Sequence, residues 1–253
     1  MVEFPASKLR EQLARSWSIT KKDILIYYYQ GPVVVFGVLF PLFLFLAFYI
    51  GREVALNFLV PGMLSMSLFF TATSVSPVIA PWETRLKTLE RLVSAPISIS
   101  AMILGDVIAS FIFGIAVSTV PLLAGFAAGV YVTDPLILSL CIVLASFCFS
   151  SFGLMLSSPP SDVPSNVMMF STFLKFPLVF ISGIFVPIEK MGPWGIIIAS
   201  GSPLTYLTDL LRYSYSGSSY YPVLLDLSVL LAFTALFFLA AVKLHEKTLP
   251  RRL

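Results

Sequence analysis

Residues 136–156 read LILSLCIVLASFCFSSFGLML, a run of 21 residues without a charged side chain. A bilayer core about 30 Å thick is crossed by about 20 helical residues that each rise 1.5 Å. The run is therefore long enough and apolar enough to cross a membrane as one helix. The stretch that follows it, Ser157 to Pro164, predicts a tight turn on the inner side that carries no chemistry of its own.

The rest of the chain repeats this pattern. Of its 253 residues, 58% are hydrophobic and 11% are charged, and the mean hydropathy is +0.94, whereas soluble domains carry about 25% charged residues. The composition predicts an all-α polytopic membrane protein. Six transmembrane helices are expected, at Val33–Ile50, Leu56–Ile79, Ile99–Val130, Leu136–Leu156, Val167–Val186 and Val223–Val242. The third run is longer than one span needs, and Pro121 predicts a kink, a tilt or an extension past the outer surface.

Lysine and arginine residues predict the orientation. Five of the 16 precede the first run, three lie between the second and third runs, and four follow the last run. On the opposite side lie only Arg52, Lys190 and Arg212, while Lys175 lies within the fifth run. Cytoplasmic loops carry the excess of these residues, so both termini are predicted to be cytoplasmic in a multi-pass protein of the cell (plasma) membrane. Spread in this way, the net charge of +3 does not indicate nucleic acid as a partner.

Two amphipathic segments are expected on the cytoplasmic side. Residues 4–30 carry an apolar stripe at helical spacing that predicts a helix lying in the membrane interface, ended by Gly31-Pro32, or else a plain anchor. The loop from Pro81 to Pro96 predicts a short amphipathic helix, which a cytoplasmic partner could hold in a groove or which is only a connector. The apolar stripes consist of Leu9, Leu13, Trp17 and Ile24 in the first segment and of Trp82, Leu86, Leu89 and Val93 in the second.

On the outer side, the segment from Pro187 to Pro222 is too apolar for an ordinary loop. Two short helices, Trp194–Ser200 and Pro203–Tyr213, are predicted in it, each too short to cross, so re-entrant or interfacial half-helices fit best. The remainder, Tyr213 to Tyr221, predicts a surface loop rich in Tyr and Ser at the level of the lipid headgroups.

The sequence has no motif for chemistry of its own. No phosphate loop, H-E-x-x-H, G-x-S-x-G or CxxC is present, so neither an enzyme nor a nucleotide, cofactor or metal site is expected on this chain. Cys141 and Cys148 are interpreted as small buried apolar residues, and His245, the single histidine, as a solvated residue of the tail. No secretory signal peptide is expected, because the charged first 32 residues contain no apolar core.

Few ionisable residues lie in or near the predicted spans: Asp106, Lys175 and Asp226. Scattered over separate spans, they do not predict a proton or ion relay. Lys175 is the costliest to place in lipid. Two interpretations of it stay open: it faces a cavity or a carboxylate, or its long side chain extends to the cytoplasmic interface.

Three passages resemble the type-2 ABC exporter permeases, the membrane subunits of drug, polysaccharide and lipid exporters. Trp82 to Leu92 (WETRLKTLERL), followed by Ala95-Pro96, is similar to the inner loop of that family. Ser182 to Pro187 (SGIFVP) is similar to the outer end of its fifth span, and Ser202 to Arg212 (SPLTYLTDLLR) to its N-P-L-T-Y…D-x-x-R segment. The chain departs from the family pattern at Thr84-Arg85 and at Ser202, which replaces the usual Asn.

The resemblance implies a half-transporter that pairs with a second permease half, alike or homologous, and works with separate ABC ATPase subunits that bind ATP and Mg. The loop residues that would couple to the ATPase are Trp82, Glu83, Arg85, Leu86, Leu89, Glu90, Arg91 and Val93. The outer motif that would form a re-entrant helix comprises Pro203, Leu204, Thr205, Tyr206, Asp209 and Arg212.

A translocation path is expected along the second and fifth runs, whose mixture of polar and aromatic residues suits an amphipathic organic molecule, a lipid or a glycan better than a bare ion. The candidate path residues are Ser67, Phe69, Phe70, Thr71, Phe170, Phe173 and Lys175. The same Ser and Thr residues are equally consistent with helix packing. An ATPase-independent secondary transporter or channel is the alternative function, against which the scarcity of buried charges counts.

The whole chain, residues 1–253, is interpreted as one transmembrane permease domain. Its parts are an interfacial helix at 1–32, the six-span region at 33–242 and a cytoplasmic tail at 243–253. Membrane lipid is expected to surround the spans.

Overall fold

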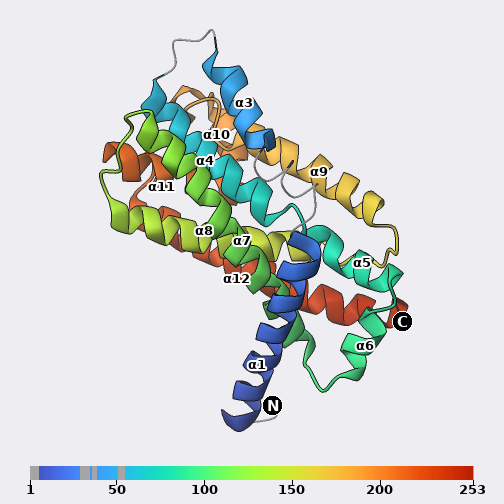
Figure 1. The fold of residues 1–253 in the computed structure, drawn as a ribbon. Coiled ribbons are helices and arrows are strands. Elements are labelled where there is room, and N and C mark those ends of the chain that lie inside the picture. Colours follow the sequence, from blue (N-terminus) through green and yellow to red (C-terminus); the bar gives the residue numbers. More distant parts are fainter. Residues whose placement is uncertain (1–5, 29–34, 36–38, 51–54, 253) are drawn as a thin grey trace.

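The computed structural model describes residues 6–28, 35, 39–50 and 55–252, which form helices joined by turns, with no strand among them (Figure 1). The α-helices are α1 (Ala6–Asp23), α3 (Phe40–Tyr49), α4 (Leu56–Ala72), α5 (Ile79–Arg85), α6 (Leu89–Ser94), α7 (Ile99–Ala127), α8 (Pro135–Leu156), α9 (Pro164–Ile181), α10 (Pro193–Ser200), α11 (Pro203–Ser216) and α12 (Val223–Thr248). Shorter turns of helix are η1 (Ile24–Tyr28), η3 (Ser76–Val78), η4 (Ile188–Lys190) and η5 (Leu249–Arg251).

Within the described residues, five helical stretches are long and apolar enough to cross a membrane: Leu56–Arg85, Ile99–Ala127, Pro135–Leu156, Pro164–Ile181 and Val223–Arg251. They correspond to the second to sixth predicted runs, which confirms an all-helical membrane protein. The first predicted run, Val33–Ile50, lies partly outside the described residues, where only the ten residues of α3 form a regular helix. The count of six spans therefore stays a prediction.

Proline and capping residues explain where several helices begin. Pro135, Pro164, Pro193 and Pro203 each stand at the first position of a helix, where a backbone N–H is not needed and the fixed φ suits the first turn. Before α8, an oxygen of Asp134 also accepts hydrogen bonds from the N–H groups of Leu136 and Ile137, both at 3.1 Å. Proline and capping residues thus set where these helices begin.

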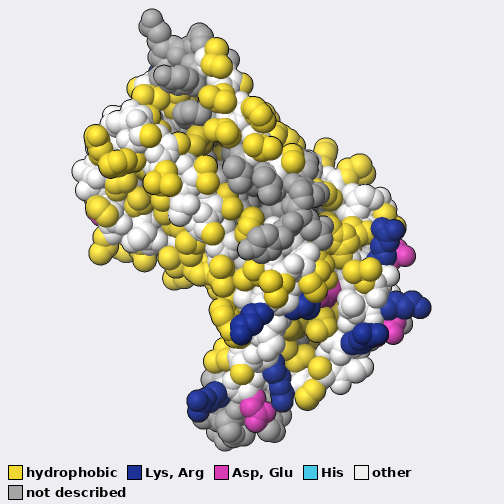
Figure 2. Space-filling view, in the orientation of Figure 1, with side chains coloured by type: hydrophobic (Ala, Val, Ile, Leu, Met, Phe, Trp, Pro, Cys, Tyr) yellow, Lys and Arg dark blue, Asp and Glu magenta, His cyan; other side chains and the backbone are white. Residues whose placement is uncertain are grey.

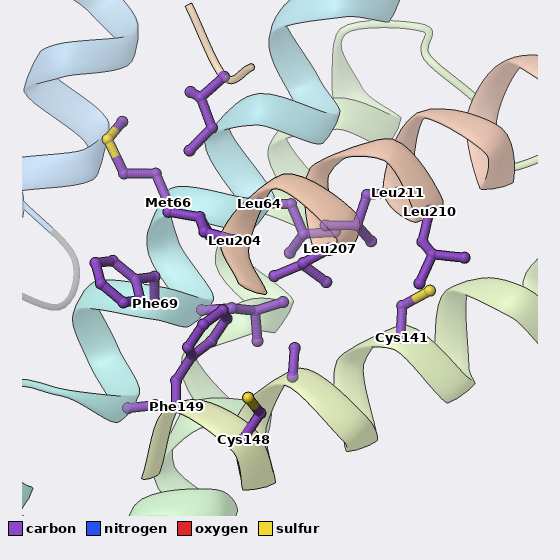
Figure 3. Packing of buried hydrophobic residues seen from close by; sticks show 14 of the residues in the cluster. Leu64, Met66, Phe69, Cys141, Cys148, Phe149, Leu204, Leu207, Leu210 and Leu211 are labelled. Carbon is purple, nitrogen blue, oxygen red and sulfur yellow. The ribbon is translucent and has the colours of Figure 1, made fainter. Parts of the chain in front are cut away.

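The core of the bundle lies around α4, which is buried along most of its length by α7, α8 and α11. Figure 3 shows Leu204, Leu207 and Leu211 of α11 directed at Leu64 and Phe69 of α4, with Phe149 of α8 nearby. Two short helices, α10 and α11, lie where the two half-helices were predicted, and their re-entrant position on the outer side stays a prediction. Since α11 has 14 residues, about 21 Å of helix, it is too short to cross a bilayer; it starts among buried residues at Pro203 and ends at the exposed Ser216.

Both termini lie at the same end of the bundle, here called the terminal end, together with α1 and α6 (Figure 1). Apolar side chains cover much of the face of the bundle that Figure 2 shows. Among the described residues, Leu123, Leu136 and Leu224 are large apolar residues that are well exposed. Such a surface suits lipid as the surrounding solvent.

Candidate functional site

At the terminal end, α1 packs lengthwise against the first half of α7. The Ser16 hydroxyl donates to the carbonyl of Ala101 at 2.5 Å, and one turn later the Thr20 hydroxyl donates to the carbonyl of Gly105 at 2.9 Å. Because the second contact lies four residues further along each helix, α1 and α7 run in the same direction where they touch. The helix follows α7 and its small polar residues face inward, while its predicted position in the membrane interface stays a prediction.

The predicted apolar stripe of α1 faces outward instead. Leu13 and Trp17 are about half exposed, and the ammonium of Lys21 lies 6.0 Å from the centre of the Trp17 ring. Apolar side chains next to a cation are typical of a helix surface that meets lipid headgroups. Contact with lipid stays a prediction; Leu9, a further member of the stripe, lies where side-chain positions are not described.

A buried charged cluster joins α1, α5 and α7. It consists of Lys22, Asp23, Glu83 and Asp106. The Lys22 ammonium donates to the Glu83 carboxylate and lies 3.0 Å from an oxygen of Asp23. Asp106 is only 4% exposed, and its carboxyl group interacts electrostatically with Asp23, Glu83 and Lys22. Three acids thus share one lysine at the junction of three helices.

Electrostatics keep Lys22 charged in this cluster. Burial acts to lower the pKa of Lys22, but the carboxylates of Glu83, Asp23 and Asp106 raise it well above its usual value. Burial raises the pKa of the Asp23 carboxyl, against the opposing effect of the nearby Lys22 ammonium.

Sequence reasoning missed this cluster because it searched for charges within the spans and found Asp106 isolated. Its partners stand outside the spans, at the end of the first helix and at the start of the inner loop. The available signal was the Lys21-Lys22-Asp23 sequence, which places an acid beside a lysine on the face of α1 that also carries Ser16 and Thr20.

The inner loop forms an elbow, and not the single amphipathic helix that was predicted. Helix α5 ends at Arg85, Lys87 takes a positive φ of 54°, and α6 starts at Leu89. The amide of Lys87 donates to Thr84 O at 3.2 Å and that of Thr88 to Glu83 O at 3.0 Å, bonds that close the turn. The prediction of a continuous helix was wrong because these turn bonds replace the helical ones.

The elbow divides the predicted coupling residues into a group that packs within the chain and a group that is exposed. Leu89 is 2% exposed and packs on Ile19, Met102 and Leu249 of the same chain, and Val93 lies against this cluster. Trp82 stacks on Tyr27 at 5.3 Å, and Glu83 belongs to the charged cluster. Leu86, at 61% exposure, forms the tip of the elbow, surrounded by the exposed charged residues Arg85, Lys87, Glu90 and Arg91.

The end of the chain is built into this region. Helix α12 continues past the predicted limit at Val242 to Thr248, so His245 is buried and its Nε2 lies 3.1 Å from the Ser157 hydroxyl. The prediction of a solvated histidine was therefore wrong. Arg252 donates to the carbonyls of Ser157 and Pro159, the latter at 2.7 Å, and its Nη1 lies 3.5 Å from the Thr84 hydroxyl. The inner turn is thus tied to both the elbow and the C-terminal end.

The candidate path residues of the second run are packed inside the bundle. Ser67, Phe69, Phe70 and Thr71 are all buried. Neighbouring hydroxyls donate to their own helix, as in the 2.7 Å bond from Thr73 to the carbonyl of Phe69. These contacts favour helix packing for the Ser and Thr residues, and the structure has no open surface at them.

The path residues of the fifth run lie on an open surface. Phe170 and Phe173 on α9 are exposed, Phe173 by 74%. A shallow, open depression, here called the groove, lies on this surface and is lined by residues of α9 alone, from Ser165 to Pro177. Lys175, 5% exposed, donates to the carbonyl of Thr73 at 3.0 Å. The salt bridges formed by the described residues do not include Lys175, so the predicted carboxylate partner is not observed, while the cavity and the cytoplasmic interface stay predictions.

At the opposite end, Asp209 and Arg212 hold the outer segment together. The Asp209 carboxylate accepts hydrogen bonds from the amides of Tyr220 and Tyr221, at 2.9 and 2.8 Å. Arg212 donates to the carbonyl of Gly183 at 2.6 Å and lies 4.0 Å from the centre of the Phe58 ring. Burial lowers the pKa of Arg212 to about 10, so it stays charged. The hydrogen bond to Gly183 connects the SPLTYLTDLLR passage, which contains Arg212, to the SGIFVP passage, which contains Gly183. Gly183 has φ +83°, a backbone conformation that strains residues with a side chain, so glycine is favoured there.

The start of α11 is fixed by hydrogen bonds to α10. The Thr205 hydroxyl donates to Ala199 O and the Tyr206 hydroxyl to Ser200 O, both at 2.7 Å. Pro203 and Leu204 are buried beside them. In the part of the chain that the structure describes, no three His, Cys, Asp or Glu side chains are grouped so that they could hold a metal ion.

Comparison with known proteins gives a family match over most of the chain. A family model described as ABC-2 type transporter matches residues 15–216. The inner membrane transport permease YadH of Escherichia coli K12 is 25% identical over 196 residues, which cover 76% of this chain and 75% of YadH. YadH proteins of Escherichia coli O157:H7 and Shigella flexneri match with the same identity and coverage. The match includes the charged cluster, the elbow and the outer motif.

Proposed function

Because the chain belongs to the ABC-2 type transporter family, we propose that it is the membrane subunit of an exporter driven by a separate ATPase subunit. Membership implies the membrane subunit of an ABC transporter. The direction of transport, the cargo and the way of coupling are our proposal: an amphipathic organic molecule, lipid or glycan is exported, and ATP and Mg bind to the partner. Catalysis belongs to that partner.

The elbow between α5 and α6 carries this proposal. It presents one exposed leucine, Leu86, among charged residues of both signs, at the end of the bundle where lysines and arginines gather (Figure 2). An apolar anchor with a charged rim is the usual composition of a protein contact. Movement of the elbow can reach the spans, because a short turn and η3 connect α5 to α4 and Glu83 is joined to Lys22.

The test of docking is the substitution Leu86→Asp. It places an unpaired charge in the proposed contact, so binding of the ATPase should weaken about a hundredfold, measured by co-purification and by titration of the purified subunits. The permease itself should keep its thermal stability, since Leu86 is exposed.

Two variants serve as controls. Leu86→Met conserves volume and should bind normally, while Leu89→Asp should unfold the terminal end, because Leu89 is buried within this chain. If Leu86→Asp binds the ATPase as the wild type does, the elbow is a connector, and an ATPase-independent transporter or channel becomes the better hypothesis.

A second permease half is proposed to face α9. This helix leaves most of its surface open, including Phe173 and the groove, whereas α4 is almost wholly covered. Two copies with their α9 faces opposed would enclose a path between them. The partner is a second copy of this chain or a homologous permease.

We further propose that the terminal end is cytoplasmic, with multi-pass insertion in the cell membrane. Cysteines at Lys190 or Ser218 should react with a membrane-impermeant thiol reagent on intact cells, while cysteines at Lys87 or Lys247 should react only after lysis. All four positions are exposed, and the natural Cys141 and Cys148 are buried, so the background should be low. Reaction at Lys87 in intact cells would reverse the orientation and exclude docking of a cytoplasmic ATPase there.

A further inference from the structure

The chain between α4 and α5 interrupts the helix and leaves a carbonyl without its helical donor. Helix α4 ends at Ala72 and α5 begins at Ile79, and residues 73–78, which include η3, are here called the break. In a continuous helix the carbonyl of Thr73 would accept from the N–H of residue 77, but Pro77 has no N–H. Because Thr73 is fully buried, its carbonyl needs another donor.

Lys175 of α9 supplies this donor. Its ammonium donates to the carbonyl of Thr73 at 3.0 Å, and its side chain is buried. Thr73 is the C-terminal cap of α4, and the carbonyl end of a helix carries a partial negative charge that stabilises a nearby cation. The contact therefore satisfies the carbonyl that Pro77 leaves without a helical partner. It also explains how the bundle accommodates a lysine that takes no part in the salt bridges of the described residues.

Helices α8 and α9 hold the break from two sides. On α8, Gly153 leaves room for the break, since a Cβ there would collide with the hydroxyl of Ser76. Helix α9 contacts η3 and α5 in addition to the bond from Lys175. A short turn of a different helix type between two α-helices often marks a hinge. Since α5 leads into the elbow, the break lies between the proposed docking site and the open face of α9.

We propose that Lys175 is a positioning residue, which donates the hydrogen bond that Pro77 cannot donate and thereby links the break to α9. Movement of the elbow changes the angle between α5 and α4 at the break, and the bond from Lys175 passes this movement to α9. The route rests on the proposed function, because it connects the ATPase to the face of a second permease half. The bond itself belongs to the permease alone, so it is tested without an ATPase.

A double-mutant cycle on the purified permease tests the bond. Lys175→Met removes the ammonium at similar side-chain length, and Pro77→Ala restores an N–H that can donate to Thr73. Lys175→Met should lower the Tm by about 5 °C more in the wild-type background than in the Pro77→Ala background, because only the first chain is left with an unsatisfied buried carbonyl. Effects of Lys175→Met that are equal in the two backgrounds would overturn the proposal.

Pro81→Ala is the matched control. Pro81 lies in the first turn of α5, where a backbone N–H is not needed, and the carbonyl four residues before it belongs to Pro77 and not to Thr73. Lys175→Met should therefore have the same effect with Pro81→Ala as without it, and Lys175→Arg, which keeps donors and charge, should retain the wild-type Tm.

Hydrogen exchange gives a measure that does not depend on how Pro77→Ala folds. The amides of the break should exchange faster in Lys175→Met than in the wild type and in Lys175→Arg, because the bond that fastens the break is lost. Equal exchange in the three chains would contradict the proposed bond.

The complex with the ATPase separates a link from a merely structural contact. A non-hydrolysable ATP analogue should change the hydrogen exchange of the break and of α9 in the wild type and in Lys175→Arg, but only that of the break in Lys175→Met. Transport should be lost in Lys175→Met while ATPase binding stays equal, because Leu86 is untouched. A response of α9 in Lys175→Met equal to the wild type would overturn the route. Should no ATPase bind the wild-type permease, the proposed function fails, whereas the double-mutant cycle still decides whether Lys175 replaces the missing donor.

Discussion

Lys22→Met should destabilise the permease by about 3–5 kcal/mol, which for a chain of this size lowers the Tm by roughly 10 °C. The substitution removes the cation that Glu83, Asp23 and Asp106 share and leaves three buried carboxyls together. Breaking a buried ion pair from one side costs more than the pair contributes, because the remaining charges have no water to solvate them. The measurement is thermal unfolding of the purified permease in detergent.

The pH dependence of this loss has a definite sign. The pKa of Asp23 is raised in the folded protein, so the folded state binds protons more readily than the unfolded state, and the stability that this provides is lost as the pH rises. Without Lys22, no cation favours the ionised carboxylates, so the loss of stability with rising pH should be larger. The Tm difference between Lys22→Met and the wild type should therefore shrink when the pH falls from about 7.5 to about 5.5.

Two further variants complete the comparison. Lys22→Arg keeps the charge and should lose little stability, and Asp106→Asn should be tolerated, because the amide removes one of the competing acids and can donate to Asp23. A Tm for Lys22→Met within about 2 °C of the wild type at neutral pH would show that the cluster is not a stabilising junction.

Much of the architecture could be predicted from apolar runs, because lipid demands that a spanning segment satisfy its own backbone hydrogen bonds. Five of the six runs correspond to helices of spanning length. The two short helices α10 and α11 were predicted on either side of Gly201-Ser202-Pro203, where the chain must turn. Their depth in the bundle was not predictable, since the leucines of α11 suit lipid and core equally.

The terminal end was predicted less well, for two physical reasons. In a soluble protein an apolar stripe marks the buried face, but α1 buries Ser16, Thr20 and Asp23 and exposes Leu13 and Trp17. Periodicity also says nothing about long-range partners: Leu89 and Leu86 occupied one predicted stripe, yet the turn at Lys87 sends Leu89 into the core and Leu86 to the surface. The elbow could be located from its sequence, but its contact residues required the structure.

Gly105→Ala should separate α1 from α7, at a cost of about 3 kcal/mol or more. A Cβ on Gly105 would lie 2.7 Å from the carbonyl oxygen of Ser16 and 2.8 Å from the Cβ of Ile19, so the backbone of α1 must move away. Overpacking of this kind costs about 1–3 kcal/mol. The hydrogen bonds that Ser16 and Thr20 donate to α7 would be lost as well, at about 1 kcal/mol each. Together these costs exceed the gain of about 1 kcal/mol from replacing a helical glycine by alanine.

Gly114→Ala is the matched control for Gly105→Ala, because it lies on the same helix, where the nearest atom to an added Cβ is the Ser146 hydroxyl at 3.3 Å. A hydroxyl can rotate away whereas a backbone carbonyl cannot, so this variant should be neutral or slightly stabilised. Hydrogen exchange should rise in residues 10–23 of Gly105→Ala alone, together with a lower Tm.

Because Lys22 moves with α1 while Leu86 keeps its exposed position, Gly105→Ala should still bind the ATPase but lose transport. Unchanged exchange in α1 would mean that the two helices are not held by this contact, and transport at the wild-type level would exclude α1 from the coupling route.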